Sequence, residues 1–229
     1  TSYKTVIAVY DEKGEPLFNK FLSTMRVSDI AISSDNKYLA ITEIDASGIN
    51  VKSQIEVFSV EKAKTDAQNS KVATYEFENN ELITNIKYQD KEKLICMSKD
   101  KIVEFALDGS KEELFNNESK KTTFQTIELA NNVAEIEEKT SDLFSADSVV
   151  TIISTENKNT STYTAKAVTK EIYTSDNIIA LNLGTEIEFI NTGGWLAKRY
   201  KATQEITNIT LSSNMAGIIY RDRIEIINL

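Results

Sequence analysis

Short segments in which apolar and polar residues alternate recur five times along the chain. Each segment is about six residues long, and its apolar positions have the period of two that a half-buried β-strand requires. The segments are 27–32, 83–88, 124–129, 168–173 and 206–211. Their central isoleucines, at positions 30, 86, 127, 172 and 209, lie 56, 41, 45 and 37 residues apart. This spacing is typical of a repeated structural unit of roughly 40–50 residues.

Each alternating segment is followed by a second, more continuous apolar run, which indicates a strand covered on both faces. These runs are 38–41, 94–97, 133–136, 178–181 and 216–219. The stretch 130–144 also fits an amphipathic helix, with Val133, Ile136 and Leu143 on one side. We favour a strand followed by a long hairpin there, because the unit would otherwise lack its second strand.

A third strand is predicted by a recurring triplet in which a glutamate stands between two apolar residues. The four glutamates are Glu56, Glu104, Glu188 and Glu225, and the remaining unit has the apolar segment 148–152 instead. Turns with glycine follow or precede these strands at 11–14, 108–109 and 191–194, where glycine supplies positive φ angles. A fourth, more polar strand is predicted at 17–21, 72–77 and 195–200.

Repeated four-stranded antiparallel units predict an all-β fold, and specifically a β-propeller with about five to seven blades. We expect a single domain over 1–229, with a partial blade at 1–22, repeats at about 27–77, 83–115, 123–165 and 168–200, and a partial blade at 206–229. The first piece supplies third and fourth strands, and the last supplies strands one to three. Either the ring has about five blades and a spare strand, or, as we favour, an upstream segment completes a larger ring.

Four longer polar connections are predicted to be mobile loops, at 45–53, 61–70, 116–122 and 155–162.

Composition argues against several classes of partner. The net charge is −9, and lysine and arginine alternate with acidic residues instead of clustering. We therefore expect neither nucleic acid nor an anionic membrane surface as a partner. No apolar stretch reaches the roughly 20 residues of a membrane span, so we expect no membrane insertion by this segment. The single cysteine, Cys96, is predicted to be a buried core residue.

The sequence contains no histidine, which excludes histidine-based triads and imidazole metal sites. We predict no catalytic, cofactor-binding or metal-binding residue, and no cofactor. The third-strand glutamates form either a ring of acids around a channel or, as we favour, a polar strand face paired with Lys or Arg. The segment 45–48 is a cation site or, as we favour, a surface turn. Trp195 either anchors a sugar or protein partner or, as we favour, packs the fourth strand against the next blade.

Three segments, 27–35, 55–58 and 218–227, carry a resemblance to a known family. The repeats are similar to those of WD40-like and quinoprotein-like propellers, without the Gly-His and Trp-Asp signatures of true WD40 blades. More closely, the chain resembles an uncharacterised family from Gram-positive, clostridia-like bacteria, whose members have a membrane helix ahead of a propeller-like ectodomain. The resemblance implies an extracytoplasmic domain tethered by an N-terminal helix absent from this chain, with a cytoplasmic location as the alternative. It implies no activity.

The sequence therefore favours a non-enzymatic module that binds a protein partner or acts as a scaffold, because propeller loops carry recognition on a rigid frame. One alternative is a sensor ectodomain for a small molecule or glycan. A second alternative is a carboxylate-dependent enzyme that acts on envelope polymers.

Overall fold

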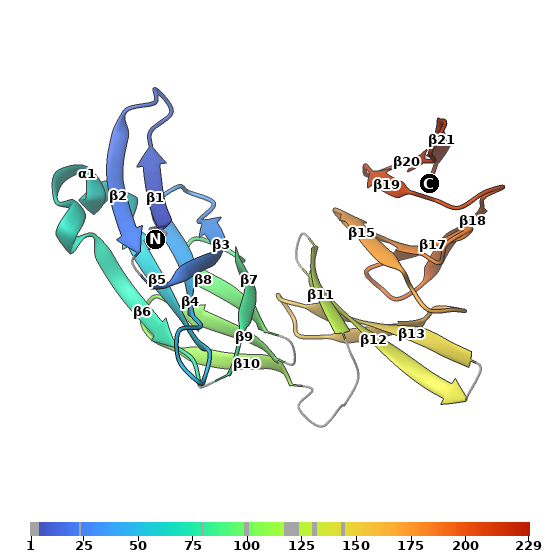
Figure 1. Ribbon diagram of the computed structural model, residues 1–229, viewed down its shortest axis with the longest axis horizontal. Coiled ribbons are helices and arrows are strands. Elements are labelled where there is room, and N and C mark those ends of the chain that lie inside the picture. The colour runs from blue at the N-terminus through green and yellow to red at the C-terminus, as the bar shows by residue number, and fades with distance from the viewer. Residues whose placement is uncertain are drawn as a thin grey trace. The chain divides into compact units, whose positions relative to one another are not determined.

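The computed structural model describes residues 5–22, 24–78, 80–98, 101–116, 124–129, 132–142 and 145–229. The chain divides into two units, residues 1–118 and 119–229, which are treated separately below. Both units consist of antiparallel sheets in which strands adjacent in sequence are hydrogen-bonded neighbours (Figure 1). The predicted single domain over 1–229 stays a prediction.

The first unit contains a two-stranded hairpin and two four-stranded sheets. The hairpin consists of β1 (Thr5–Tyr10) and β2 (Pro16–Leu22). The next sheet consists of β3 (Arg26–Ile32), β4 (Tyr38–Asp45), β5 (Lys52–Ser59) and β6 (Lys71–Glu76). The last consists of β7 (Ile83–Tyr88), β8 (Lys93–Ser98), β9 (Lys101–Ala106) and β10 (Lys111–Asn116).

The second unit contains two four-stranded sheets and one three-stranded sheet. The first consists of β11 (Phe124–Leu129), β12 (Asn132–Asp142), β13 (Ser145–Ser154) and β14 (Thr160–Thr164). The second consists of β15 (Glu171–Ser175), β16 (Ile178–Asn182), β17 (Glu186–Asn191) and β18 (Leu196–Lys201). The third consists of β19 (Asn208–Leu211), β20 (Met215–Ile219) and β21 (Ile224–Asn228).

The predicted strands are present, and two of the first strands begin later than expected. β15 begins at Glu171 instead of 168, because the backbone N–H of Thr169 bonds to the Ser148 hydroxyl. β19 begins at Asn208 instead of 206, because the N–H of Ile206 bonds to the Gly184 carbonyl. Within 130–144 the described residues form strand β12, so the helical alternative for this stretch is wrong. Residues 130, 131, 143 and 144 lie outside the described residues.

The predicted loop at 61–70 is instead a short helix, α1 (Val60–Thr65), followed by the 3₁₀ turn η1 (Ala67–Asn69). The Ser59 hydroxyl caps α1 by accepting the N–H of Lys62 at 3.3 Å. Ala63 is buried in a cluster with residues of β2 and β5. A helix of one and a half turns shows no apolar period in the sequence, and tertiary burial of Ala63 outweighs the polar composition.

The other predicted loops are shorter than expected. β4 extends to Asp45 and β5 begins at Lys52, and β14 begins at Thr160, inside the predicted loop 155–162. Residues 117–122 lie outside the described residues. The predicted mobility of these connections stays a prediction.

Within each unit, the sheets pack face to face through apolar clusters. Phe18 on β2 lies against Phe58 on β5, with ring centroids 5.6 Å apart. Ile55 and Val57 on β5 pack against the sheet that begins with β7, and Cys96 lies in the same cluster. Cys96 is 1 % exposed, so its predicted place in the core is confirmed, and burial raises the pKa of its thiol. In the described residues, no helix has the length and apolar character needed to span a membrane.

Candidate functional site

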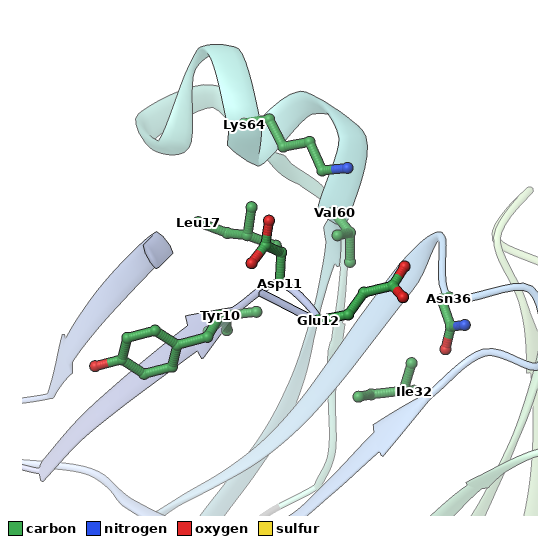
Figure 2. Close-up of a pocket in the computed structure, with 9 residues that line it drawn as sticks. Tyr10, Asp11, Glu12, Leu17, Ile32, Asn36, Val60 and Lys64 are labelled. Atoms are coloured by element: carbon green, nitrogen blue, oxygen red, sulfur yellow. The ribbon is translucent and has the colours of Figure 1, made fainter. Parts of the chain in front are cut away.

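A pocket of about 340 Å³ lies in the first unit, between two turns and the helix α1 (Figure 2). Its volume is at the lower end of the range of small-ligand sites in proteins, about 300–1,000 Å³. The β1–β2 turn, the end of β3, the β3–β4 turn and α1 all contribute to it. The lining residues are Val9, Tyr10, Asp11, Glu12, Leu17, Ile32, Asn36, Val60 and Lys64.

Hydrogen bonds inside the β1–β2 turn fix one wall of this pocket. The Asp11 carboxylate accepts the backbone N–H groups of Lys13 at 2.9 Å and Glu15 at 2.8 Å. Gly14 has a φ of 82°, a left-handed conformation that glycine adopts without strain. The Asp11 carboxylate therefore has a structural role in the turn, which holds Tyr10 and Glu12 at the rim.

The opposite wall is formed by α1 and the β3–β4 turn, which are bonded to each other. The N–H of Val60 donates to the Lys37 carbonyl at 2.8 Å, so the first residue of α1 is tied to that turn. Asn36 in the turn has a φ of 57°, a conformation that asparagine tolerates better than most residues. Burial of Ala63 holds the other side of the helix.

The pocket combines exposed apolar surface with charges at its rim. Tyr10 and Ile32 are 58 % and 57 % exposed, so both present apolar surface to solvent. Val9, Leu17 and Val60 supply further apolar lining. Glu12 and Lys64 bring opposite charges to the pocket (Figure 2). Such a surface suits an apolar or aromatic group that carries polar atoms.

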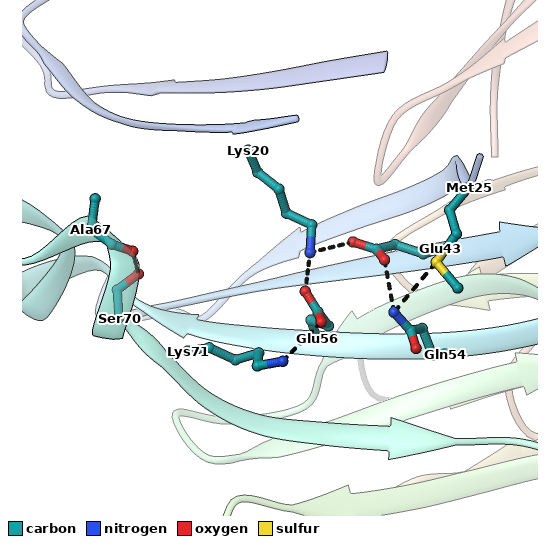
Figure 3. A network of polar contacts seen from close by, with 8 residues as sticks. All are labelled: Lys20, Met25, Glu43, Gln54, Glu56, Ala67, Ser70 and Lys71. Atoms are coloured by element: carbon teal, nitrogen blue, oxygen red, sulfur yellow. Dashed lines mark hydrogen bonds and ion pairs between the residues drawn. The ribbon is translucent and has the colours of Figure 1, made fainter. Parts of the chain in front are cut away.

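Three of the four third-strand glutamates, Glu56, Glu188 and Glu225, form junctions between neighbouring sheets. Lys20 on β2 lies 2.7 Å from the Glu43 carboxylate and also bonds to Glu56 on β5 (Figure 3). Lys71 on β6 contacts Glu56 from the other side at 3.0 Å, and Gln54 donates to Glu43 at 2.9 Å. Burial opposes ionisation of Glu56, but hydrogen bonds from the two lysines outweigh it and lower the pKa of this carboxyl.

Glu188 and Glu225 repeat this arrangement in the second unit. Glu188 is fully buried and accepts from Arg199 on β18 at 2.8 Å and from the Tyr163 hydroxyl on β14 at 2.9 Å. Burial and the Glu188 carboxylate together raise the pKa of Tyr163 to about 12. Glu225 accepts from Arg223 at 2.8 Å and from the Tyr200 hydroxyl on β18. Each glutamate therefore bonds to the fourth strand of the preceding sheet.

Glu104 differs from the other three glutamates. In the strand register it lies opposite Ile95, on the face away from the cluster that contains Cys96 and Val103. Glu56, by contrast, lies opposite Ile41, on the face that packs against the β1–β2 hairpin. Glu104 is paired with Lys93 of its own sheet at 2.8 Å. The Val103-Glu104-Phe105 triplet therefore matches the other triplets in sequence but is displaced by one residue in the sheet. A displacement by one residue turns a strand side chain to the opposite face of the sheet.

The predicted pairing of the four glutamates with Lys or Arg is confirmed. Three of these glutamates, Glu56, Glu104 and Glu188, are buried. Buried carboxylates require cationic partners and additional hydrogen bonds, which explains why Glu56 and Glu188 each accept from two donors.

The segment 45–48 forms a turn. The Asp45 carboxylate accepts the N–H of Ser47 at 2.9 Å and its hydroxyl at 2.6 Å. Over the described part of the chain, no three His, Cys, Asp or Glu side chains cluster as metal ligands.

Trp195 does not pack against a neighbouring sheet, so that prediction is wrong. It lies in the β17–β18 turn and is 73 % exposed. The Asn191 side chain accepts the N–H groups of Gly193 and Trp195, which fixes the turn, and the indole ring lies over Gly193. The tight turn therefore directs the side chain into solvent.

The pocket is not predicted from the sequence, although two elements that line it, the β1–β2 turn and the helix α1, each have a recognisable sequence pattern. The Asp-x-x-Gly pattern at 11–14 predicts a turn, and Ser59 before a polar segment is a helix-cap pattern. The proximity of these two features depends on packing of the hairpin against the next sheet, which no local pattern shows.

Stacked four-stranded antiparallel sheets with such junctions define a β-propeller fold, and comparison with solved structures shows the same class. The β-propeller domain of the trilobed protease from Pyrococcus furiosus, described as having an open velcro topology, aligns with a TM-score of 0.57 at 9 % identity. That alignment covers 98 % of this chain and 74 % of that one. The propeller domain of Cps50 (Swd1) from Myceliophteria thermophila aligns with a TM-score of 0.55 at 8 % identity, over 97 % and 79 % of the two chains.

Oligogalacturonate lyase in complex with manganese aligns with a TM-score of 0.58 at 5 % identity, over 88 % of this chain and 65 % of that chain. At these identities the likeness shows the fold alone. The predicted all-β, propeller-type fold is confirmed, and the number of blades stays a prediction. Residues 1–229 match the model of the Family of unknown function (DUF5711), and the chain belongs to this family. A search of curated proteins finds no match.

Proposed function

We propose that this domain is a non-catalytic interaction module that binds a segment of a protein partner through the pocket between the β1–β2 turn and α1. The observation that supports this proposal is the exposure of Tyr10 and Ile32 beside Val9, Leu17 and Val60. Exposed aromatic and aliphatic side chains in a preformed pocket are typical of the anchor points of protein interfaces. The hydrogen-bonded turns keep this surface rigid, which lowers the entropic cost of binding.

The disposition of the acidic residues also supports binding over catalysis. Glu43, Glu56 and Glu188 lie between sheets and are held by cations or hydroxyl groups. Within the pocket, the Asp11 carboxylate is occupied by its own turn. The net charge of −9 supports a protein partner over nucleic acid.

We also propose, from the resemblance alone, that the module lies outside the cytoplasmic membrane and is tethered by an upstream helix. A cytoplasmic location is the alternative. Accessibility of the full-length protein to added protease on intact cells distinguishes the two.

Selection from a random peptide display library tests the interaction function. Peptides enriched on the 229-residue chain are expected to lose about tenfold or more in affinity when Tyr10 or Ile32 is changed to Ser, because these side chains supply the exposed apolar surface. The matched control is Ile49→Ser, since Ile49 is fully exposed in the same unit and does not line the pocket. Enriched peptides that bind the Ile32→Ser and Ile49→Ser variants equally well would rule out the pocket as the site.

A small-molecule or glycan sensor is the second candidate, because the pocket volume of about 340 Å³ also suits a small ligand. A ligand at about 100 times its Kd stabilises the folded state by roughly 2.7 kcal/mol. A thermal-shift screen with monosaccharides and small aromatic compounds is therefore expected to give a rise of Tm that Ile32→Ser removes and Ile49→Ser leaves intact. Failure of every compound would leave the peptide-binding proposal as the stronger one.

A further inference from the structure

We propose that the pocket of the first unit is one end of a longer groove, and that this groove binds an extended basic segment of a protein partner. The other end of the groove is a cavity of about 690 Å³ between the β3–β4, β7–β8 and β9–β10 turns, here called the second cavity. An aromatic or aliphatic residue of the partner lies in the pocket, and its lysine or arginine residues lie in the second cavity. This proposal rests on the proposed function, because it names the chemistry of the partner that the pocket binds.

The pocket and the second cavity share the β3–β4 turn. Ile32 and Asn36 line the pocket, whereas Ser34, which lies between them in the sequence, lines the second cavity. The backbone from Ile32 to Ser34 spans at most about 7 Å, because an extended chain covers no more than about 3.6 Å per residue. All three residues are exposed. One extended segment that crosses this turn therefore contacts both cavities.

Hydrogen bonds fix the turns around the second cavity. The N–H of Leu107 donates to the Glu92 carbonyl at 3.2 Å, which ties the β9–β10 turn to the β7–β8 turn. Within the β7–β8 turn, the N–H of Gln89 donates to the Lys93 carbonyl at 3.0 Å. The Asp90 carboxylate accepts the N–H groups of Glu92 and Lys93, each at 2.8 Å. The second cavity is therefore preformed, which lowers the entropic cost of binding.

The second cavity carries an excess of negative charge. Three carboxylates line it, those of Asp90, Glu92 and Asp108, together with the ammonium groups of Lys91 and Lys93. Lys93 pairs with the buried Glu104 carboxylate at 2.8 Å, so its charge is already compensated. Among the described residues that line this cavity, Lys91 is then the one cation that opposes the three carboxylates.

The arrangement of these carboxylates suits an extended basic peptide better than a metal ion. Asp90 and Asp108 each accept a backbone N–H at 2.8 Å, a neutral donor that positions the carboxylate and leaves its negative charge uncompensated. In the part of the chain that the structure describes, no three such side chains cluster as metal ligands. Carboxylates on separate turns are complementary to basic side chains spaced along a peptide. The net charge of −9 also favours the approach of a basic partner.

The sequences of the peptides selected on the 229-residue chain test this proposal. We expect enrichment of Lys or Arg at about two to five residues from the aromatic or aliphatic anchor, because an extended peptide rises about 3.3 Å per residue. A fluorescently labelled synthetic peptide with the consensus sequence of the enriched pool is then titrated with the chain, and binding is followed by fluorescence anisotropy.

The double variant Glu92→Gln, Asp108→Asn removes two negative charges from the second cavity and retains an oxygen that accepts the N–H of Ser110. The affinity of the consensus peptide is expected to fall by about fivefold or more, because two ion pairs with the peptide are lost. The matched control is Glu76→Gln, Glu78→Gln, which removes the same charge from exposed positions that line neither cavity. Its affinity is expected to stay within about twofold of that of the parent chain.

Two results would overturn this proposal and leave the proposed function standing. The first is a pool of peptides that bind through Ile32 but show no enrichment of basic residues. The second is an equal loss of affinity in the double variant and its control, because overall charge would then account for the preference. Failure of the proposed function is recognised separately: the enriched peptides then bind Ile32→Ser as tightly as the parent chain, or no peptide is enriched. Either of these results would overturn both proposals.

Discussion

The Lys20 ammonium lies between two carboxylates, Glu43 and Glu56, where the β1–β2 hairpin packs against the next sheet (Figure 3). It also lies 5.0 Å from the ring centroid of Phe58, within the range of a cation–π contact. The side chains of Glu43 and Glu56 are 1 % and 10 % exposed. Removal of the lysine would leave both carboxylates buried with a much reduced counter-charge.

Lys20→Met is therefore expected to destabilise the first unit by about 3 kcal/mol, because loss of the ammonium group leaves the buried carboxylates without this cationic partner. Urea denaturation followed by circular dichroism measures this change. Lys37→Met is the matched control, since Lys37 is 64 % exposed and its pair with Asp35 contributes at most about 1 kcal/mol. The triple variant Lys20→Met, Glu43→Gln, Glu56→Gln is expected to recover part of the loss. Equal effects of Lys20→Met and Lys37→Met would contradict this account.

The same network predicts a pH dependence in the acid range. The pKa of Glu56 in the folded state lies below its ordinary value of 4.5, so ionised Glu56 favours the folded protein. This stabilisation is present above the unfolded pKa and is lost as the pH falls through the folded pKa. The free energy of unfolding of Glu56→Gln is therefore expected to vary less below about pH 4.5 than that of the parent chain. Denaturation curves at several pH values check this, and parallel profiles would argue against it.

At the scale of single elements, the β17–β18 turn depends on close packing at one glycine. Gly194 has a φ of 77°, and a Cβ atom at this position would lie 2.9 Å from the Thr162 carbonyl oxygen of β14. Both the left-handed backbone and this approach disfavour any side chain. The β17–β18 turn therefore packs closely against β14 of the preceding sheet in the second unit.

Gly194→Ala is expected to destabilise the second unit by about 2 kcal/mol, since alanine is strained at positive φ and a backbone oxygen must move. Gly48→Ala is the control, because the nearest atom to its added Cβ is 3.8 Å away. That change is expected to be neutral or to stabilise by up to about 1 kcal/mol. Thermal unfolding of both variants provides the measurement, and a neutral Gly194→Ala would exclude the strain.

The sequence predicts most of the strands because their alternation and turn chemistry are local properties. Residues 83–88 and 124–129 match β7 and β11 to the residue. Features that depend on packing between elements cannot be predicted from local sequence patterns. The helix α1 is held by burial of Ala63, and the side on which Glu104 points depends on strand register. Trp195 is exposed because its turn directs it outward, which hydrophobicity alone does not indicate. The pocket is missed because it combines features that are distant in sequence.

At the scale of the whole molecule, internal repetition lets one sheet serve as the reference for another. Ile55, Ile187 and Ile224 occupy the same place in their triplets, each just before the junction glutamate. The first two are fully buried against the following sheet of their unit, whereas Ile224 is 64 % exposed. The same substitution at the three positions therefore compares burial directly, with strand position and neighbouring charge held nearly constant.

Ile55→Lys and Ile187→Lys are each expected to cost about 4 kcal/mol or more, because an unpaired ammonium would be buried in an apolar cluster. Ile224→Lys is expected to change stability by no more than about 0.5 kcal/mol, since the side chain is already in contact with water. Thermal and urea denaturation of the three variants measure the difference. A large loss of stability for Ile224→Lys would mean that the outer face of β21 is covered in solution by another part of the protein or by a second copy. A small loss of stability for all three variants would mean that burial of the isoleucine before the glutamate does not set the cost of this substitution.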